Sequence, residues 1–163
     1  MGLFLAKRFI YSRIQVFILF RLYNKKIFFV KSIIKLLLRF YSRWYRIQIE
    51  LNAKIEPGFY IGHFGNIIVA GDSKIGKNCN ISQGVTKGST YRGTKIGTPK
   101  LGNEIWIGAN AVIVGNIKIG NNVLIAPNSY VNSDIPDNSL VFGNPATIKN
   151  CINSTEGYLN NKI

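Results

Sequence analysis

The sequence has few histidines, cysteines and acidic side chains. Its 163 residues include one His, two Cys and seven Asp or Glu. One histidine is too few for a metal centre built from several imidazoles, so no metal cofactor is expected. Two cysteines, in a chain with no recognisable secretory signal, do not make a disulfide framework and are typical of a reducing compartment. These shortages favour a cytoplasmic protein without bound metal.

Long apolar runs are also missing from the start of the chain. The longest mainly apolar, uncharged run there is Ile14–Phe20, whereas a spanning helix needs roughly 18 residues. Arg13 interrupts the apolar stretch, and no small-residue cleavage pattern follows it. We therefore expect neither a signal peptide nor a transmembrane segment.

Glycine and proline are nearly absent from the first fifty residues, where positive charge and aromatic rings gather. Residues 1–50 hold one Gly, no Pro, eleven of the 21 Lys and Arg and twelve aromatic residues, and the remainder holds fifteen Gly and all five Pro. The length suits one compact unit. Within it we expect a basic helical segment over 1–50, a second domain over 51–150 and a polar tail over 151–163.

Basic residues recur at helical spacing between Lys25 and Ile49. Every fourth residue is basic at Lys31, Lys35, Arg39 and Arg43. Because most positions between them are apolar or aromatic, the pattern predicts an amphipathic helix over Lys25–Ile49 with a cationic stripe. A shorter helix is predicted over Leu3–Tyr23.

Two interpretations of this basic segment are open. Its apolar face can pack on the following domain or on a neighbouring subunit, with the lysines solvated. Basic residues with Trp, Tyr and Phe are also the composition of a helix on an anionic membrane, which would place the protein on the inner face of the cytoplasmic membrane. Nucleic acid is not expected as a partner, because no recognised binding motif accompanies the charge.

The strongest pattern is a six-residue repeat. One aliphatic track consists of Leu101, Ile107, Ile113, Ile119, Ile125 and Val131, and a companion track consists of Ile105, Ala111, Ile117, Val123, Ser129 and Ile135. A helix cannot keep this period, whereas short strands joined by tight turns can, and stacked coils then bury one core. We predict a mainly β fold, a parallel β-helix of hexapeptide repeats, with Cys79 as a small core residue. The spacing breaks over Lys87–Lys100, which predicts a projecting loop.

Several motifs together resemble those of the left-handed β-helix acyltransferases. They are the hexapeptide repeats and the segments Ile61–Val69, Ile81–Thr86, Trp106–Ala109 and Gly143–Ala146. The likeness is closest to the serine acetyltransferase-like branch, which includes O-acetyltransferases of capsule and lipopolysaccharide sugars. The resemblance implies a homotrimer of left-handed prisms, with active sites between neighbouring subunits and acetyl-CoA as co-substrate.

The resemblance also implies a catalytic role for the single histidine. His63 matches the family's first catalytic histidine, and a group with a pKa near 7 is needed to accept the acceptor hydroxyl's proton as its oxygen attacks the thioester. A carboxylate would orient the imidazole. Glu50 is the nearest upstream acid and Asp72 an alternative, although the family's aspartate maps close to Gln48.

Other site residues follow from the same resemblance. It implies co-substrate contacts at Gly108, Ala109, Ala126, Asn132, Ser133 and Lys149, the last near phosphate. Pro127, beside Ala126, stands where relatives often have Ala and has no N–H to donate. Trp106 can form an aromatic wall for a sugar ring or lie at a subunit interface.

The loop departs from the family in one respect that bears on the acceptor. Serine acetyltransferases have a second histidine before Pro-Lys, whereas Thr98 stands there in this chain. The first expectation is therefore an O-acetyltransferase acting on a hydroxyl of a bacterial surface polysaccharide or its lipid-linked precursor, with Thr98 near the acceptor. Serine O-acetyltransferase of cysteine biosynthesis is the alternative, and a non-catalytic β-helix that binds an anionic partner is the third.

Overall fold

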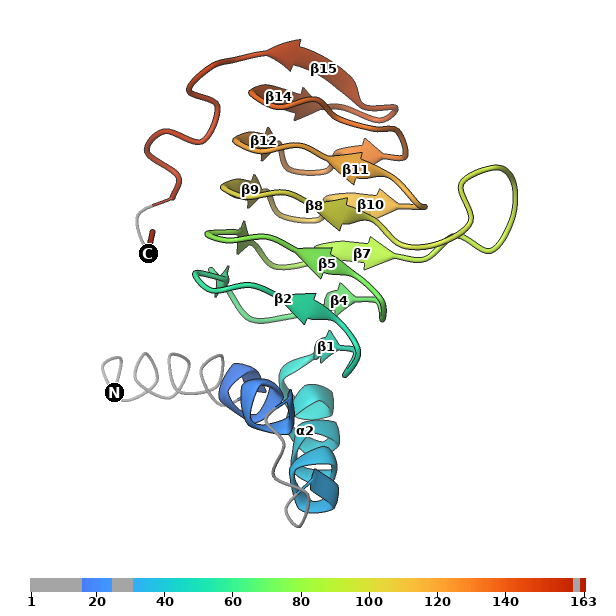
Figure 1. The fold of residues 1–163 in the computed structure, drawn as a ribbon, viewed down its shortest axis with the longest axis vertical. Helices are drawn as coiled ribbons and strands as arrows, with labels where there is room; N and C mark the ends of the chain where they lie inside the picture. Colours follow the sequence, from blue (N-terminus) through green and yellow to red (C-terminus); the bar gives the residue numbers. More distant parts are fainter. Residues whose placement is uncertain (1–15, 25–30, 160–161) are drawn as a thin grey trace.

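A three-sided stack of short parallel strands forms the body of the molecule (Figure 1). The structure is a computed structural model, and it describes residues 16–24, 31–159 and 162–163. Sheet A contains β1 (Ile47–Ile49), β4 (Ile67–Val69), β7 (Thr86–Gly88), β10 (Val112–Val114) and β13 (Tyr130–Val131). Sheet B contains β2 (Lys54–Ile55), β5 (Lys74–Ile75), β8 (Lys100–Leu101) and β11 (Lys118–Ile119). Sheet C contains β3 (Tyr60–Ile61), β6 (Asn80–Ile81), β9 (Ile105–Ile107), β12 (Val123–Ile125), β14 (Ser139–Phe142) and β15 (Thr147–Asn150).

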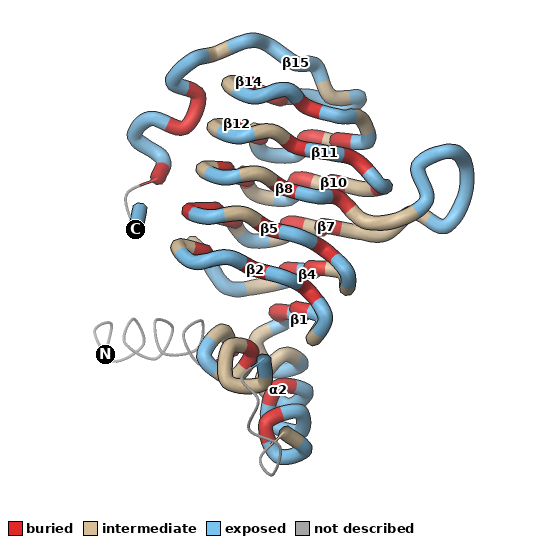
Figure 2. Tube along the Cα trace, in the orientation of Figure 1, coloured by how far each residue is buried: buried red, intermediate tan, exposed pale blue. Residues whose placement is uncertain are grey.

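The inward-facing residues are those of the two six-residue tracks. All twelve are buried, and Figure 2 shows buried positions recurring along every coil. Neighbouring coils pair in parallel, so that Ile107 lies over Ile81 and under Ile125. Among the strands of the described residues, only β15 runs antiparallel to its neighbour. Burying one such aliphatic side chain contributes roughly 1.5–3 kcal/mol. The predicted parallel β-helix is confirmed.

Left-handed backbone conformations close the corners between sheets B and C. Four residues with φ between +51° and +56° lie in register there, one per coil, and we call them the corner column: Asn78, Glu104, Asn122 and Asn138. Asn adopts this region more readily than most residues because its short polar side chain bonds locally. Their side chains therefore point outward at one edge of the prism.

Helices cover the first coil. Residues 16–24 are helical, and α2 spans Lys31–Tyr45. Val16, Phe20, Ile34 and Leu38 are buried in the same core as the strands, so packing against the following domain is confirmed for this face. The helix ends four residues before the predicted Ile49, because Arg46 takes a φ of 53° and turns the chain into β1.

Parts of both predicted helices, residues 3–15 and 25–30, lie outside the described residues. Within residues 16–24, 31–159 and 162–163, we find no helix with the length and hydrophobicity to cross a membrane.

The projecting loop leaves the prism later than predicted. Lys87 still belongs to β7, where it pairs with Val69 and is only 1% exposed. Its Nζ donates a hydrogen bond of 2.7 Å to the carbonyl of Pro99, at the far end of the loop. Burial lowers the pKa of Lys87 from 10.5 to about 7 and raises the pKa of the Cys79 thiol to about 11. Cys79 is fully buried, as predicted for a core residue.

Replacing Lys87 with methionine should change the stability of the fold in a pH-dependent way, with the variant gaining on the parent more at pH 6 than at pH 9. The unfolded lysine binds its proton up to a pKa of 10.5 and the folded one only up to about 7, so the stability lost to this buried amine grows as the pH falls between these values. Methionine removes that loss, and its gain at pH 6 should exceed its gain at pH 9 by about 3 kcal/mol. Thermal melts at both pH values measure it. The exposed Lys77→Met is the control, and equal gains for Lys87→Met at both pH values would contradict the lowered pKa.

Candidate active site

His63 stands at the corner where the chain passes from sheet C to sheet A. It lies two residues after the end of β3, and its side chain is exposed. A cleft of about 240 Å³ opens beside it, lined by Tyr60, Gly62, His63, Asn80, Ile81, Ser82, Trp106 and Tyr158. The imidazole is therefore accessible to a substrate.

Three of the predicted co-substrate residues share this corner with His63. The register of Ile61 with Ile81, Ile107 and Ile125 places Gly108, Ala109 and Ala126 further along the same edge of the prism. Coils rise by about 4.8 Å, so Ala109 lies about 10 Å above His63. A Cβ on Gly108 would come within 2.5 Å of the Pro127 nitrogen, so only glycine fits there. An extended chain laid along this edge would end beside the imidazole.

The predicted carboxylate and loop residue lie at a different corner, between sheets A and B. Glu50, Asp72 and Thr98 line a second cleft of about 590 Å³, together with Tyr91 of the loop. Glu50 accepts a hydrogen bond of 2.8 Å from Gln48 Nε2. The two clefts have no described residue in common, so Glu50 does not orient His63 within one subunit.

The remaining predicted co-substrate residues are distributed over the far end of the prism. Asn132 and Ser133 follow β13 of sheet A, on the same side as the second cleft. Lys149 lies in β15, at the end of the prism away from the helices (Figure 1). In one subunit the predicted site residues are thus distributed over two corners, sheet C and the far end of the prism.

Fixed contacts hold the loop over the second cleft. Thr90 and Gly97 pair across it in an antiparallel bridge. The Lys95 carbonyl accepts from the Asn116 N–H at 2.9 Å, and Lys95 Nζ donates to the Asn132 carbonyl at 2.9 Å. The loop is therefore closed on itself at its base and tied to the prism through Lys95.

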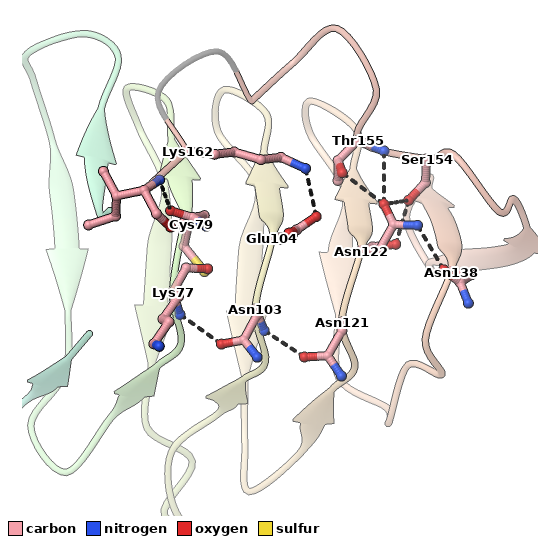
Figure 3. Close-up of polar contacts among 12 residues, drawn as sticks. Lys77, Cys79, Asn103, Glu104, Asn121, Asn122, Asn138, Ser154, Thr155 and Lys162 are labelled. Carbon is pink, nitrogen blue, oxygen red and sulfur yellow. Dashed lines mark hydrogen bonds and ion pairs between the residues drawn. The ribbon is translucent and has the colours of Figure 1, made fainter. Parts of the chain in front are cut away.

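The tail, predicted only as polar, docks back along the prism (Figure 3). Its contacts are made to the corner column: Thr155 Oγ1 to Asn122 Oδ1 at 2.7 Å, Lys162 Nζ to Glu104 Oε2 at 2.7 Å, and the Ile163 N–H to Asn78 Oδ1 at 3.0 Å. Ser154 and Thr155 are buried by this docking. The tail is thus an integral part of the folded unit.

Docking of the tail adds a third aromatic ring, that of Tyr158, to the cleft that Tyr60 and Trp106 already line. The Tyr158 ring packs on Trp106 with centroids 4.7 Å apart, and Asn80 Nδ2 donates to the Tyr158 carbonyl at 3.3 Å. Sequence reasoning identified Trp106 but missed Tyr158. The available signal was an aromatic residue within an otherwise polar tail.

Comparisons with known proteins agree with this geometry. The family described as bacterial transferase hexapeptide (six repeats) matches residues 98–133. The chain is 31% identical over 125 residues to the serine acetyltransferase of Helicobacter pylori, covering 77% of this chain and 71% of that protein. The chain belongs to the serine acetyltransferase family. Both the family and its left-handed β-helix fold were predicted and are confirmed.

Other family members match over a smaller share of their length. Identity is 36% over 128 residues to the serine acetyltransferase of Staphylococcus aureus strain N315, and the match covers 78% of this chain and 59% of that relative. A crystal structure of the Brucella abortus enzyme in complex with coenzyme A has a TM-score of 0.71 at 29% identity, over 83% of this chain and 53% of that one. The Neisseria gonorrhoeae enzyme in complex with serine has a TM-score of 0.67 at 34% identity, over 83% and 54%.

Replacing Asn122 with glycine should loosen the tail. Glycine tolerates the φ of +51° but removes the amide that bonds Thr155 and Asn138. Because an unsatisfied buried polar group costs roughly 1–3 kcal/mol, amide hydrogen exchange over residues 151–159 should accelerate about tenfold. The matched control is Asn128→Gly, at a φ of +60° on another corner. Equal acceleration in both variants would refute the role of the corner column in holding the tail.

Proposed function

We propose that this chain is an acetyl-CoA-dependent O-acetyltransferase with His63 as its general base. The observation that carries the proposal is the exposed imidazole at the foot of the edge occupied by Gly108, Ala109 and Ala126. That edge offers backbone groups and small side chains along which a pantetheine arm can lie. The coenzyme A complex of a family member supports the same co-substrate.

The proposed reaction needs one base. The imidazole accepts the proton of the acceptor hydroxyl as its oxygen attacks the thioester carbonyl. The tetrahedral intermediate then collapses, the carbon–sulfur bond breaks, and the imidazolium returns the proton to the departing thiolate. Backbone N–H groups or a hydroxyl at the cleft must stabilise the oxyanion during this step.

L-serine is the acceptor that the comparisons favour, over the surface glycan predicted first. The relatives described above are serine acetyltransferases, and one was solved in complex with serine. A glycan hydroxyl is the second candidate on a specific observation. Tyr60, Trp106 and Tyr158 line the His63 cleft with aromatic rings, a surface suited to a sugar.

We propose further that the active unit is a homotrimer. His63 and Glu50 occupy different corners of one prism, so a neighbouring copy is needed to bring a Glu50 and Thr98 corner against a His63 corner. Sheet A offers an outer face for the contact, with Ile68 40% exposed and Val112 and Tyr130 half-buried in its column.

Peripheral attachment to an anionic membrane is also proposed, through α2. The face opposite Ile34 and Leu38 carries four apolar residues that are 59–72% exposed: Ile33, Leu36, Phe40 and Trp44. Lys35, Arg39 and Arg43 run beside this face, and α2 has no acidic residue. A second copy of the same face would oppose like charges, so an anionic lipid surface is the better complement. This would hold the enzyme at the inner face of the cytoplasmic membrane.

Thiol release from acetyl-CoA tests the activity and the acceptor together. The full chain should release thiol with L-serine, and a screen of defined glycans tests the second candidate. His63→Ala should lower turnover by about a hundredfold or more, because it removes the base. The control Lys77→Gln, at the corner between sheets B and C, should turn over normally. Full turnover by His63→Ala would overturn the base assignment.

Vesicle co-sedimentation tests the membrane proposal. The chain should bind phosphatidylglycerol vesicles, and added salt should weaken the binding by screening the cations. Phe40→Ser with Trp44→Ser should weaken it about tenfold. Tyr91→Ser with Ile96→Ser, exposed positions on the loop, should leave it unchanged. Equal binding to phosphatidylcholine vesicles would contradict the electrostatic part.

A further inference from the structure

Four lysines stand in register on the outer face of sheet B. Lys54 pairs with Lys74, Lys74 with Lys100 and Lys100 with Lys118, and all four are exposed. We call them the lysine column. Figure 1 shows their strands β2, β5, β8 and β11 stacked along the prism axis. With strands about 4.8 Å apart, the column is about 14 Å long.

The four ammonium groups of the column make no ion pair among the described residues, although the Asp134 carboxylate accepts a hydrogen bond of 2.9 Å from the Lys118 backbone N–H. In the described part of the chain the one ion pair is Lys162 with Glu104, outside the column. Glu56, Asp72 and Asp134 border the column without pairing with its ammonium groups. Like charges in register on a sheet are destabilising. The strands that carry neighbouring lysines are about 4.8 Å apart, which is less than the Debye length of about 8 Å, so the electrostatic potentials of these lysines add.

Glycines line one side of the column. Two residues after each of three lysines stands a glycine: Gly76, Gly102 and Gly120. A Cβ at these positions would meet atoms of the next coil at 2.3–2.8 Å, so the prism itself requires them to be glycine. The side-chain oxygens of Asn103, Asn121 and Asp137 lie against these glycines, so the column borders a polar strip, which we call the glycine strip.

The types of side chain on this face favour one class of anionic partner over the others. On the other side of the column stand Asn52, Asp72, Thr98 and Asn116, so the outward positions carry no apolar or aromatic side chain. Lipid binding requires apolar residues that insert, and single-stranded nucleic acid requires rings that stack on bases. Separate point charges beside a flat polar strip match a hydroxyl-rich chain that carries acidic groups at intervals.

We propose that the lysine column binds a linear anionic glycan, with its carboxylates or phosphates against the ammonium groups and its sugars over the glycine strip. This binding surface goes beyond acyl transfer and does not require it. Lys100 follows Thr98 by two residues, so the column adjoins the second cleft.

The test uses polygalacturonate as the probe and the full chain without acetyl-CoA. Lys74→Gln with Lys100→Gln should weaken binding about tenfold. Lys77→Gln with Arg92→Gln removes the same charge from exposed positions outside the column and should change binding by less than about threefold. Binding should also fall with salt, and neutral dextran should not bind. The melting temperature of the column variant should equal or exceed that of the parent, because repulsion is relieved.

The proposal would be overturned if the parent chain did not bind polygalacturonate, or if the two double variants lost binding equally. It would also be overturned if the column bound phosphatidylglycerol vesicles or single-stranded DNA but not polygalacturonate. Thiol release is measured on the same preparations. A preparation that binds polygalacturonate but does not release thiol speaks against the acetyltransferase activity and leaves the column intact.

Discussion

Stacking of inward aliphatic side chains, one above another in successive coils, is the constraint on which the rest of this structure depends. Ile81, Ile107 and Ile125 fix the register of three coils, and every outward residue then inherits a place directly over its counterpart below. Polar and charged side chains are consequently arranged in columns along the prism. One edge carries His63 with the small residues above it, a second edge carries the corner column that holds the tail, and the face of sheet B carries lysines.

The same constraint explains how much the sequence could predict. A period of six determines which side chains point inward, so the β-helix, the buried Cys79 and the place of the loop follow from Leu101–Val131 and its companion track. Lys87 was misjudged because its chemistry suggested a loop, whereas its position, six residues after Ile81, belongs to the inward track. Burial at that position depends on a partner, the Pro99 carbonyl, which only the closed coil supplies.

Docking of the tail was beyond sequence reasoning for a geometric reason. The members of the corner column are separated by 26, 18 and 16 residues (78 to 104, 104 to 122, 122 to 138), an uneven series that reveals no pattern until the coils are stacked. The separation of Glu50 from His63 was hidden in the same way, because thirteen residues along the chain (50 to 63) carry it past sheet B and sheet C to another corner. Sequence distance is a poor guide to proximity where each coil turns through three sides.

The way the loop joins the prism has a consequence for how such a protein can change. Thr86 lies opposite Val112, 26 residues later, whereas Val112 lies opposite Tyr130 after 18, so the coil absorbs eight additional residues without losing register. The bond from Lys87 to Pro99 closes the coil beneath this insertion as though the chain were continuous. The length and composition of the segment above it can therefore diverge while the scaffold that supports it keeps its own register.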